Sequence, residues 1–197
     1  MLSVCMIVLD EEECISRSLT SIHPYIDEIV IVDGGSKDKT REIATTFNKV
    51  ILLENSWPED YSIQRNIAID HSKGDWIFSL DADEYLMEYV GQNLKRLTEF
   101  SEYDAYRFMY KHFFDNNFDN IFSTDYHIKM FKRHCRFVGK YHEAPEGYKT
   151  VIDTNMEIWH YKKAEWQQKD NEHYWDLGQK PSPGWIKTAG KWVNTGG

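Results

Sequence analysis

The stretch Gly74-Asp75-Trp76-Ile77-Phe78-Ser79-Leu80-Asp81-Ala82-Asp83-Glu84 joins an apolar run to a cluster of carboxylates. Its residues 76–80 have the length and composition of a buried strand. Asp81, Asp83 and Glu84 follow directly, and like charges this close repel one another. Mg²⁺ or Mn²⁺ would relieve the repulsion, because these cations prefer carboxylate oxygens. The alternative is a solvated acidic turn, because Asp-x-Asp is common by itself.

Upstream of this stretch, short apolar strands alternate with helical patterns. The predicted strands are 4–9, 28–32 and 50–53, and a fourth is 76–80. The helices between them are marked by Ile15, Leu19 and Ile22, by Ile43 and Phe47, and by the segment 61–71, which has Ile63 and Ile67 on one face.

This β-α-β-α-β-α-β order predicts a parallel sheet with helices on both faces. Ligands of such sheets bind beyond the carboxyl ends of the strands. Asp10, Asp33 and the pair Asp81 and Asp83 each follow or end a predicted strand. We therefore expect these carboxylates to converge on one rim.

The second half of the chain is less regular. A helix is predicted from Leu86, Val90, Leu94 and Leu97, and strands are predicted at 105–112, 127–131 and 154–161. Residues 113–125 read as a loop or hairpin tip, and residues 139–147 as a polar turn. The tail beyond residue 165 is rich in tryptophan.

The composition is that of a globular protein, with 41% hydrophobic and 15% aromatic residues among 197. A net charge of −9 argues against a protein that grips nucleic acid through its phosphates. The three cysteines form no CxxC pair, which favours reduced thiols in a cytoplasmic protein. The first residues predict a strand rather than a signal peptide, and no apolar run is long enough to span a bilayer.

Four blocks together resemble family 2 glycosyltransferases of the GT-A fold, in particular a small bacterial and phage group that includes lipopolysaccharide core-type transferases. The blocks are residues 2–12, residues 29–40, Gln64-Arg65-Asn66 and residues 74–84. A weaker match continues through residues 139–143 and 158–161. The family usually has Asn-Glu after the first strand, where this chain has Asp10-Glu11, and an aspartate can accept hydrogen bonds from the base but has no amide to donate.

The resemblance implies a domain over residues 1–161. Its nucleotide-binding half would be residues 1–100 and its acceptor-side half residues 101–161. Residues 162–197 would form an extension that packs on or near this domain. The implied donor is a nucleotide-diphosphate sugar, with UDP expected, and the acceptor could be a glycan, a lipid-linked molecule or a protein. Peripheral contact with a membrane is compatible with this scheme.

Site roles follow from the same resemblance. Asp10, Asp33, Arg65 and Asp81 would contact the nucleotide, although Asp33 could instead start an Asx-turn and Arg65 could instead pair with Asp81. Asp83 and His160 would hold Mn²⁺ or Mg²⁺.

An inverting transfer also needs one carboxylate to take the proton of the acceptor hydroxyl. Glu143 is the candidate for this base, with His142, Glu146 and Asp153 as rivals.

Three other functions are compatible with parts of this pattern. A nucleotidyltransferase shares the α/β order, but it would be expected to have a glycine-rich basic loop where this chain has Asp10-Glu11-Glu12-Glu13. A non-catalytic module of the same fold would bind nucleotide or sugar without transfer. A scaffolding protein would keep every measurable activity when Asp83 is replaced.

Overall fold

The computed structural model describes residues 1–114, 121, 123–162, 185–188 and 191–194. The elements of the first half are β1 (Leu2–Val8), α1 (Ile15–Ile22), the 3-10 turn η1 (His23–Tyr25), β2 (Glu28–Asp33), α2 (Thr40–Thr45), β3 (Val50–Glu54), α3 (Tyr61–His71) and β4 (Trp76–Ser79). The second half contains β5 (Glu84–Leu86), α4 (Glu88–Leu97), β6 (Ala105–Phe114), β7 (Ser123–Lys132), β8 (Arg136–Val138), β9 (Ala144–Glu146) and β10 (Val151–Lys162).

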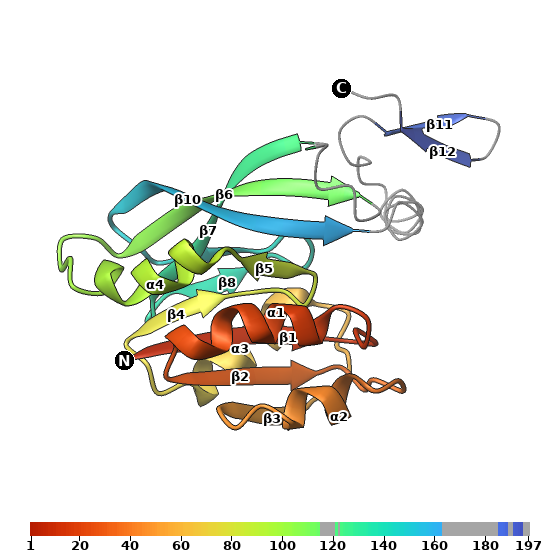
Figure 1. Cartoon of the computed structure of the whole chain (residues 1–197), viewed down its shortest axis with the longest axis horizontal. Helices are drawn as coiled ribbons and strands as arrows, with labels where there is room; N and C mark the ends of the chain where they lie inside the picture. Colours follow the sequence, from red (N-terminus) through yellow and green to blue (C-terminus); the bar gives the residue numbers. More distant parts are fainter. Residues whose placement is uncertain (115–120, 122, 163–184, 189–190, 195–197) are drawn as a thin grey trace.

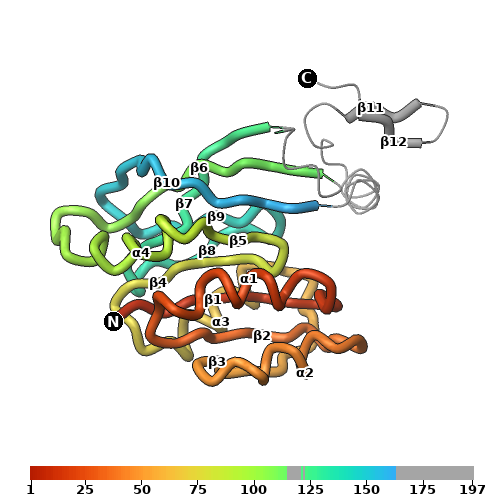
Figure 2. Tube along the Cα trace, in the orientation of Figure 1, coloured from red at the N-terminus to blue at the C-terminus, as the bar shows by residue number. Residues whose placement is uncertain are grey.

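One eight-stranded sheet organises the described part of the chain, in the order β3-β2-β1-β4-β7-β6-β10-β5. The first four strands are mutually parallel, which confirms the βαβ prediction. β7 and β5 run antiparallel to their neighbours, whereas β6 and β10 are parallel to each other. Figure 2 shows how β4 lies beside β1, although α1, α2 and α3 separate them in sequence.

Helices cover both faces of the parallel half (Figure 1). α1, α2 and α4 lie on one face, where Leu19 and Val90 are fully buried in the same apolar cluster as alternate residues of β1. α3 covers the other face, and its buried apolar positions there are Ala68 and Ile69. Because β1 is buried on both sides, its apolar residues form a continuous run rather than an alternating one.

Several details of the predicted pattern were wrong. Leu86 lies in β5 and not in the helix, which begins at Glu88. β6 and β7 pair antiparallel on either side of the segment that was expected to be a loop or hairpin tip, although β6 runs to Phe114 and β7 already begins at Ser123. β9 forms inside the expected turn. Within α3, Ile63 is 46% exposed, because this helix turns Gln64 to the sheet instead.

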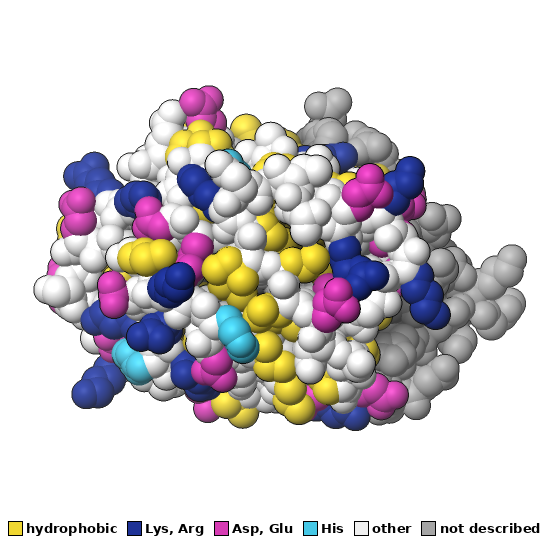
Figure 3. All heavy atoms as spheres, turned by 90° about the horizontal axis from the view of Figure 1, so that it is seen from below, with side chains coloured by type: hydrophobic (Ala, Val, Ile, Leu, Met, Phe, Trp, Pro, Cys, Tyr) yellow, Lys and Arg dark blue, Asp and Glu magenta, His cyan; other side chains and the backbone are white. Residues whose placement is uncertain are grey.

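The edge strand β3 lies at the bottom of Figure 1, and Figure 3 shows the molecule from that side. Lys and Arg side chains are interspersed with Asp and Glu side chains on this face, with hydrophobic side chains between them. Ile51 of β3 contributes to the exposed apolar surface.

Most of the Trp-rich tail lies outside the described residues. The expectation that residues 162–197 pack on the domain therefore concerns residues outside the described part. The described tail segments are β11 (Trp185–Thr188) and β12 (Lys191–Asn194), which pair antiparallel. Among the described residues, no helix is both long and apolar enough to cross a bilayer.

Candidate active site

Three acidic strand ends lie side by side at the carboxyl edge of the parallel strands. β2, β1 and β4 are adjacent and parallel, so their carboxyl ends share one rim. Asp33 is the last residue of β2, Asp10 follows β1 by two positions, and Asp81 follows β4 by two. The sheet topology therefore brings together carboxylates that are up to 71 positions apart, as the strand pattern predicted.

Asp10 and Asp33 meet through the loop that follows β2. The carboxylate of Asp33 is fully buried and accepts hydrogen bonds from the backbone N–H groups of Gly35 and Ser36 and from the Ser36 hydroxyl. Asp10 accepts from the Lys37 backbone N–H at 2.7 Å and donates its own N–H to Ser36 Oγ at 2.9 Å. Asp33 thus forms the Asx-type turn that was the alternative reading, and a direct nucleotide contact by this residue stays a prediction.

Asp81 is held by two cations. Arg65 Nη1 donates to its Oδ1 at 2.7 Å, and Lys129 Nζ lies 3.6 Å from its Oδ2. Burial alone would raise the pKa of the Asp81 carboxyl, but the charges of Arg65 and Lys129 outweigh it and hold that pKa far below its usual range. Asp81 is therefore an ionised anchor of the turn that carries Asp83.

Arg65 links this anchor to Glu143. Its Nε donates to Glu143 Oε1 at 2.5 Å, and its guanidinium lies over the Phe137 ring at 5.2 Å from the centroid. The Arg65 and Glu143 side chains are 11% and 9% exposed. From the sequence, Arg65 could either contact the nucleotide or pair with Asp81. The structure shows the ion pair with Asp81.

The backbone near Glu143 has an unusual conformation. His142 has φ +55°, in the left-handed region that non-glycine residues rarely occupy. Such conformations concentrate at functional sites, where surrounding contacts hold them in place. Here the Arg65 ion pair anchors the adjacent Glu143.

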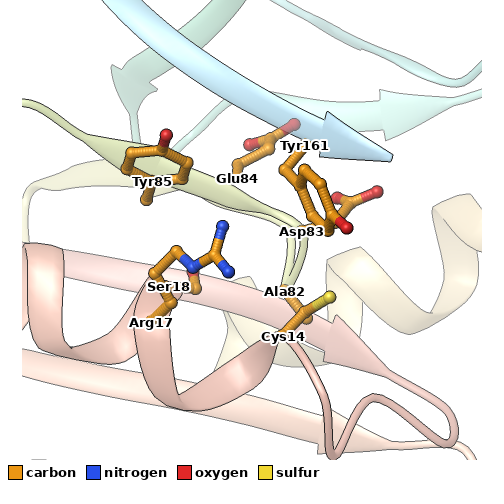
Figure 4. A pocket seen from close by; sticks show the side chains of 8 residues that line it. All are labelled: Cys14, Arg17, Ser18, Ala82, Asp83, Glu84, Tyr85 and Tyr161. Carbon is orange, nitrogen blue, oxygen red and sulfur yellow. The ribbon is translucent and has the colours of Figure 1, made fainter. Parts of the chain in front are cut away.

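Asp83 faces His160 across the β5–β10 pairing. β10 pairs antiparallel with β5 and places His160 opposite Glu84. Asp83 Oδ2 accepts a hydrogen bond from His160 Nε2 at 2.9 Å, and its backbone oxygen accepts from the Tyr161 N–H at 2.9 Å. Burial disfavours the imidazolium, but Asp83 outweighs that effect, so the pKa of His160 is raised. In Figure 4, Asp83 and Tyr161 lie together at one end of a small pocket.

A buried network behind the turn was not predicted from the sequence. Glu84 is 2% exposed, accepts from the Tyr110 hydroxyl and pairs with Lys129 Nζ at 2.9 Å. The Lys129 side chain is 8% exposed, and this residue was not among those predicted for the site. No local pattern identified it, because its partners come from β5 and the turn before it, at least 45 positions upstream.

Glu11 also belongs to this rim. Burial, together with the negative charges of Asp83, Asp81 and Asp38, raises the pKa of Glu11 to about 8. These three carboxylates and Glu11 make a region of strongly negative potential. A bound cation would partly neutralise it.

The side chains at this rim fit a divalent cation whose remaining ligands come from a substrate. Asp83 and His160 supply one carboxylate and one imidazole, already within 2.9 Å of each other. In the described part of the chain, no group of three or more His, Cys, Asp or Glu side chains has a geometry that could by itself hold a metal ion. Mg²⁺ and Mn²⁺ sites commonly use one or two protein ligands and complete the shell with phosphate oxygens and water.

Comparison with known proteins identifies the family. The family model described as glycosyl transferase family 2 matches residues 3–165. The chain belongs to glycosyl transferase family 2. A resemblance first carried by four short blocks thus extends across nearly the whole described sheet.

The curated relatives that the chain matches are longer than the chain. SunS of Bacillus subtilis is 27% identical over 163 residues, which cover 79% of this chain and 38% of SunS. A TPR repeat-containing protein of Synechococcus elongatus is 47% identical over 85 residues, covering 43% of this chain and 21% of that protein. LpsC of Rhizobium meliloti is 29% identical over 109 residues, covering 51% of this chain and 38% of LpsC. The chain therefore spans well under half the length of these relatives.

The fold of this family 2 member is the GT-A fold. The structure of S. aureus TarS 1-349 in complex with UDP superimposes with a TM-score of 0.60 at 14% identity, covering 82% of this chain and 60% of that one. The complex of the same protein with UDP-GlcNAc gives a TM-score of 0.57 at 15% identity, covering 82% and 58%. The predicted fold class is confirmed.

Proposed function

We propose that this domain transfers a sugar, with inversion, from a nucleotide-diphosphate sugar to an acceptor hydroxyl, with the help of a divalent metal. The observation that carries the proposal is the Asp83–His160 pair, which lies on the same rim as the Asp81–Arg65–Glu143 chain. One end of the rim thus offers ligands for a cation, and the other offers a fixed carboxylate.

UDP is the proposed donor nucleotide. The structural neighbour TarS is described in complex with UDP and with UDP-GlcNAc, and it shares the GT-A fold with this chain. Asp10, the Asp33 loop and the Arg65–Asp81 pair are the proposed nucleotide-side elements. Asp83 and His160 would hold Mn²⁺ or Mg²⁺, which supplies positive charge to the leaving diphosphate.

Glu143 is the proposed base. As the acceptor oxygen bonds to the anomeric carbon, the bond from that carbon to the diphosphate oxygen breaks, and its electron pair leaves with the nucleotide. The proton of the acceptor hydroxyl passes to the Glu143 carboxylate. Arg65 holds that carboxylate in one orientation, since its guanidinium is fixed at the same time by Asp81 and Ser79 Oγ. Attack on the face opposite the leaving group inverts the anomeric configuration.

A thermal-shift screen of nucleoside diphosphates with and without Mn²⁺ tests the donor site. A ligand that binds only the folded protein stabilises it by about 2.7 kcal/mol at 100 times its dissociation constant. We expect stabilisation by UDP that depends on Mn²⁺ and is lost in Asp83→Asn but kept in Asp70→Asn, a control on the exposed face of α3. The absence of a metal-dependent shift with every nucleotide would refute the proposal.

Turnover separates the enzyme from a non-catalytic module of the same fold. The module would show the same nucleotide- and metal-dependent shift, yet it would release no UDP from any UDP-sugar. We expect slow UDP release from a cognate UDP-sugar even without acceptor, because water can replace the acceptor hydroxyl. Release from no sugar in a broad panel, with or without candidate acceptors, favours the module.

A further inference from the structure

A chain of hydrogen bonds runs from His160 away from Asp83 toward solvent. His160 Nδ1 lies 2.7 Å from His112 Nδ1, and His112 Nε2 lies 2.9 Å from Asp125 Oδ1. The exposed fractions of the side chains rise along it, from 17% for His160 to 20% for His112 and 53% for Asp125. β6, β7 and β10, which are adjacent in the sheet, each supply one member.

The atoms of this chain restrict where its protons can lie. The Asp125 carboxylate only accepts hydrogen bonds, so the hydrogen between it and His112 belongs to His112 Nε2. A neutral His112 then has a bare Nδ1, which accepts. The hydrogen between the two rings therefore belongs to His160 Nδ1. His160 Nε2 donates to Asp83 in this arrangement, and a cation that takes the place of this hydrogen bond would meet the Nε2 lone pair of a neutral ring whose proton stays on Nδ1.

We propose that His112 and Asp125 are positioning residues that select the His160 tautomer with a free Nε2 for the metal. The inference rests on the proposed function, because it takes His160 as a metal ligand. Metal-binding histidines commonly donate their second ring N–H to a carboxylate or carbonyl partner, which fixes both the ring and the tautomer. Here an additional imidazole is inserted between the ligand ring and the carboxylate.

Other contacts support a rigid arrangement of the two rings. The His112 and His160 centroids lie 4.9 Å apart at an interplanar angle of 79°. The Tyr110 ring lies 5.6 Å from His112 and 6.1 Å from His160, and it is itself fixed through its hydroxyl to Glu84. His127 donates to the second Asp125 oxygen at 2.9 Å, which orients that carboxylate.

The test is Mn²⁺ affinity in the presence of UDP, measured from the electron paramagnetic resonance signal of free Mn²⁺. We expect His112→Leu to weaken Mn²⁺ binding by about 10- to 100-fold, the usual effect of losing a residue that orients a metal ligand. Asp125→Ala should weaken it in the same direction. His112→Gln should recover part of the affinity, because its side-chain oxygen can accept from His160 Nδ1. His71→Leu is the matched control, since the hydrogen-bond partner of His71 among the described residues is the Ile67 carbonyl on α3.

A second readout reports the tautomer directly. Long-range nitrogen-15 correlation spectra with Mg²⁺ and UDP should show His160 protonated on Nδ1 in the wild type and a mixture of tautomers in His112→Leu. If His112→Leu does not fold, the wild-type spectrum and His112→Gln carry the test. A wild-type His160 with its proton on Nε2 would overturn the proposal.

The outcomes separate this inference from the function on which it rests. If the wild type binds no Mn²⁺ with any nucleoside diphosphate, the metal-dependent function fails and the inference fails with it. If the wild type binds Mn²⁺, His160→Ala does not, and a folded His112→Leu binds as tightly as the wild type, then only the positioning role is wrong.

Discussion

Arg65 Nε donates a hydrogen bond to Glu143 Oε1 at 2.5 Å, between residues 78 positions apart. The same guanidinium donates through Nη1 to Asp81 at 2.7 Å. One side chain on α3 therefore connects the turn after β4 with the loop before β9. A planar guanidinium can serve two carboxylates at fixed angles, which a lysine ammonium cannot reproduce.

Replacing Arg65 should destabilise the fold as well as abolish transfer. Arg65→Met leaves the Glu143 carboxylate buried without its cation, and removing one partner of a buried ion pair costs about 3–5 kcal/mol of unfolding free energy. Urea denaturation measures this. Arg107→Met is the control, because its pair with Asp153 is about half exposed and should contribute less than about 1 kcal/mol. Similar costs for the two variants would mean that the Arg65 network is not a structural anchor.

Glu143→Gln should separate chemistry from binding. The amide cannot take a proton from the acceptor, so we expect a loss of about 100- to 10,000-fold in kcat, as is typical when a general base is removed. The affinity for UDP with Mn²⁺ should stay near that of the wild type.

Glu146→Gln is the matched control for this variant, because Glu146 is an exposed residue of β9 and a rival candidate for the base. If Glu143→Gln keeps near wild-type turnover while Glu146→Gln loses it, the role of base belongs to Glu146.

The two aspartates of the 81–83 turn should respond differently to replacement. Asp81→Asn removes the negative charge that balances Arg65 and Lys129. The free energy of unfolding of this variant should therefore fall. Asp83→Asn can still accept from His160, so stability should change little, while the Mn²⁺-dependent binding of UDP is lost. Denaturation and isothermal titration calorimetry of both variants check this division. Equal loss of metal binding in both, at equal stability, would contradict it.

Asp104 should contribute stability that depends on pH. Hydrogen bonds from Lys132 Nζ and the Lys149 backbone N–H lower the pKa of Asp104 from its ordinary value of 3.8 to about 2. A lowered carboxyl pKa stabilises the fold above the unfolded value and loses that contribution as pH falls through the folded value. The stability gap between wild type and Asp104→Asn should be full above about pH 4 and close toward pH 2. Urea titrations at several pH values measure it, and a gap that does not vary with pH would exclude this linkage.

The alternation of strands and helices in the first half was predictable because it depends on local periodicity. β1, β2 and β4 are buried over their whole length and have continuous apolar runs, which only strands buried on both faces allow. α3 was predicted with its observed bounds, 61–71. The face of that helix that packs on the sheet was not predicted. Gln64 is buried there and forms hydrogen bonds with Asn55, and apolar periodicity does not detect a buried polar residue of this kind.

β5 shows where local pattern is insufficient. Its three residues precede the helix that begins at Glu88, and Leu86 falls in phase with the apolar positions of that helix. Only pairing with β10, more than 70 positions later in the chain, makes residues 84–86 a strand. That same pairing brings His160 to Asp83, so the element missed from sequence is the one that assembles the proposed metal site.

The sequence by itself determined the parallel sheet, its acidic rim and the family, because strand ends and motif order are encoded locally. Only the tertiary structure decided the partners: Arg65 with Glu143, Lys129 with Glu84, and His112 between His160 and Asp125. These contacts join residues from different helices, strands and loops. Their energies depend on distances and burial that exist only once the sheet has formed.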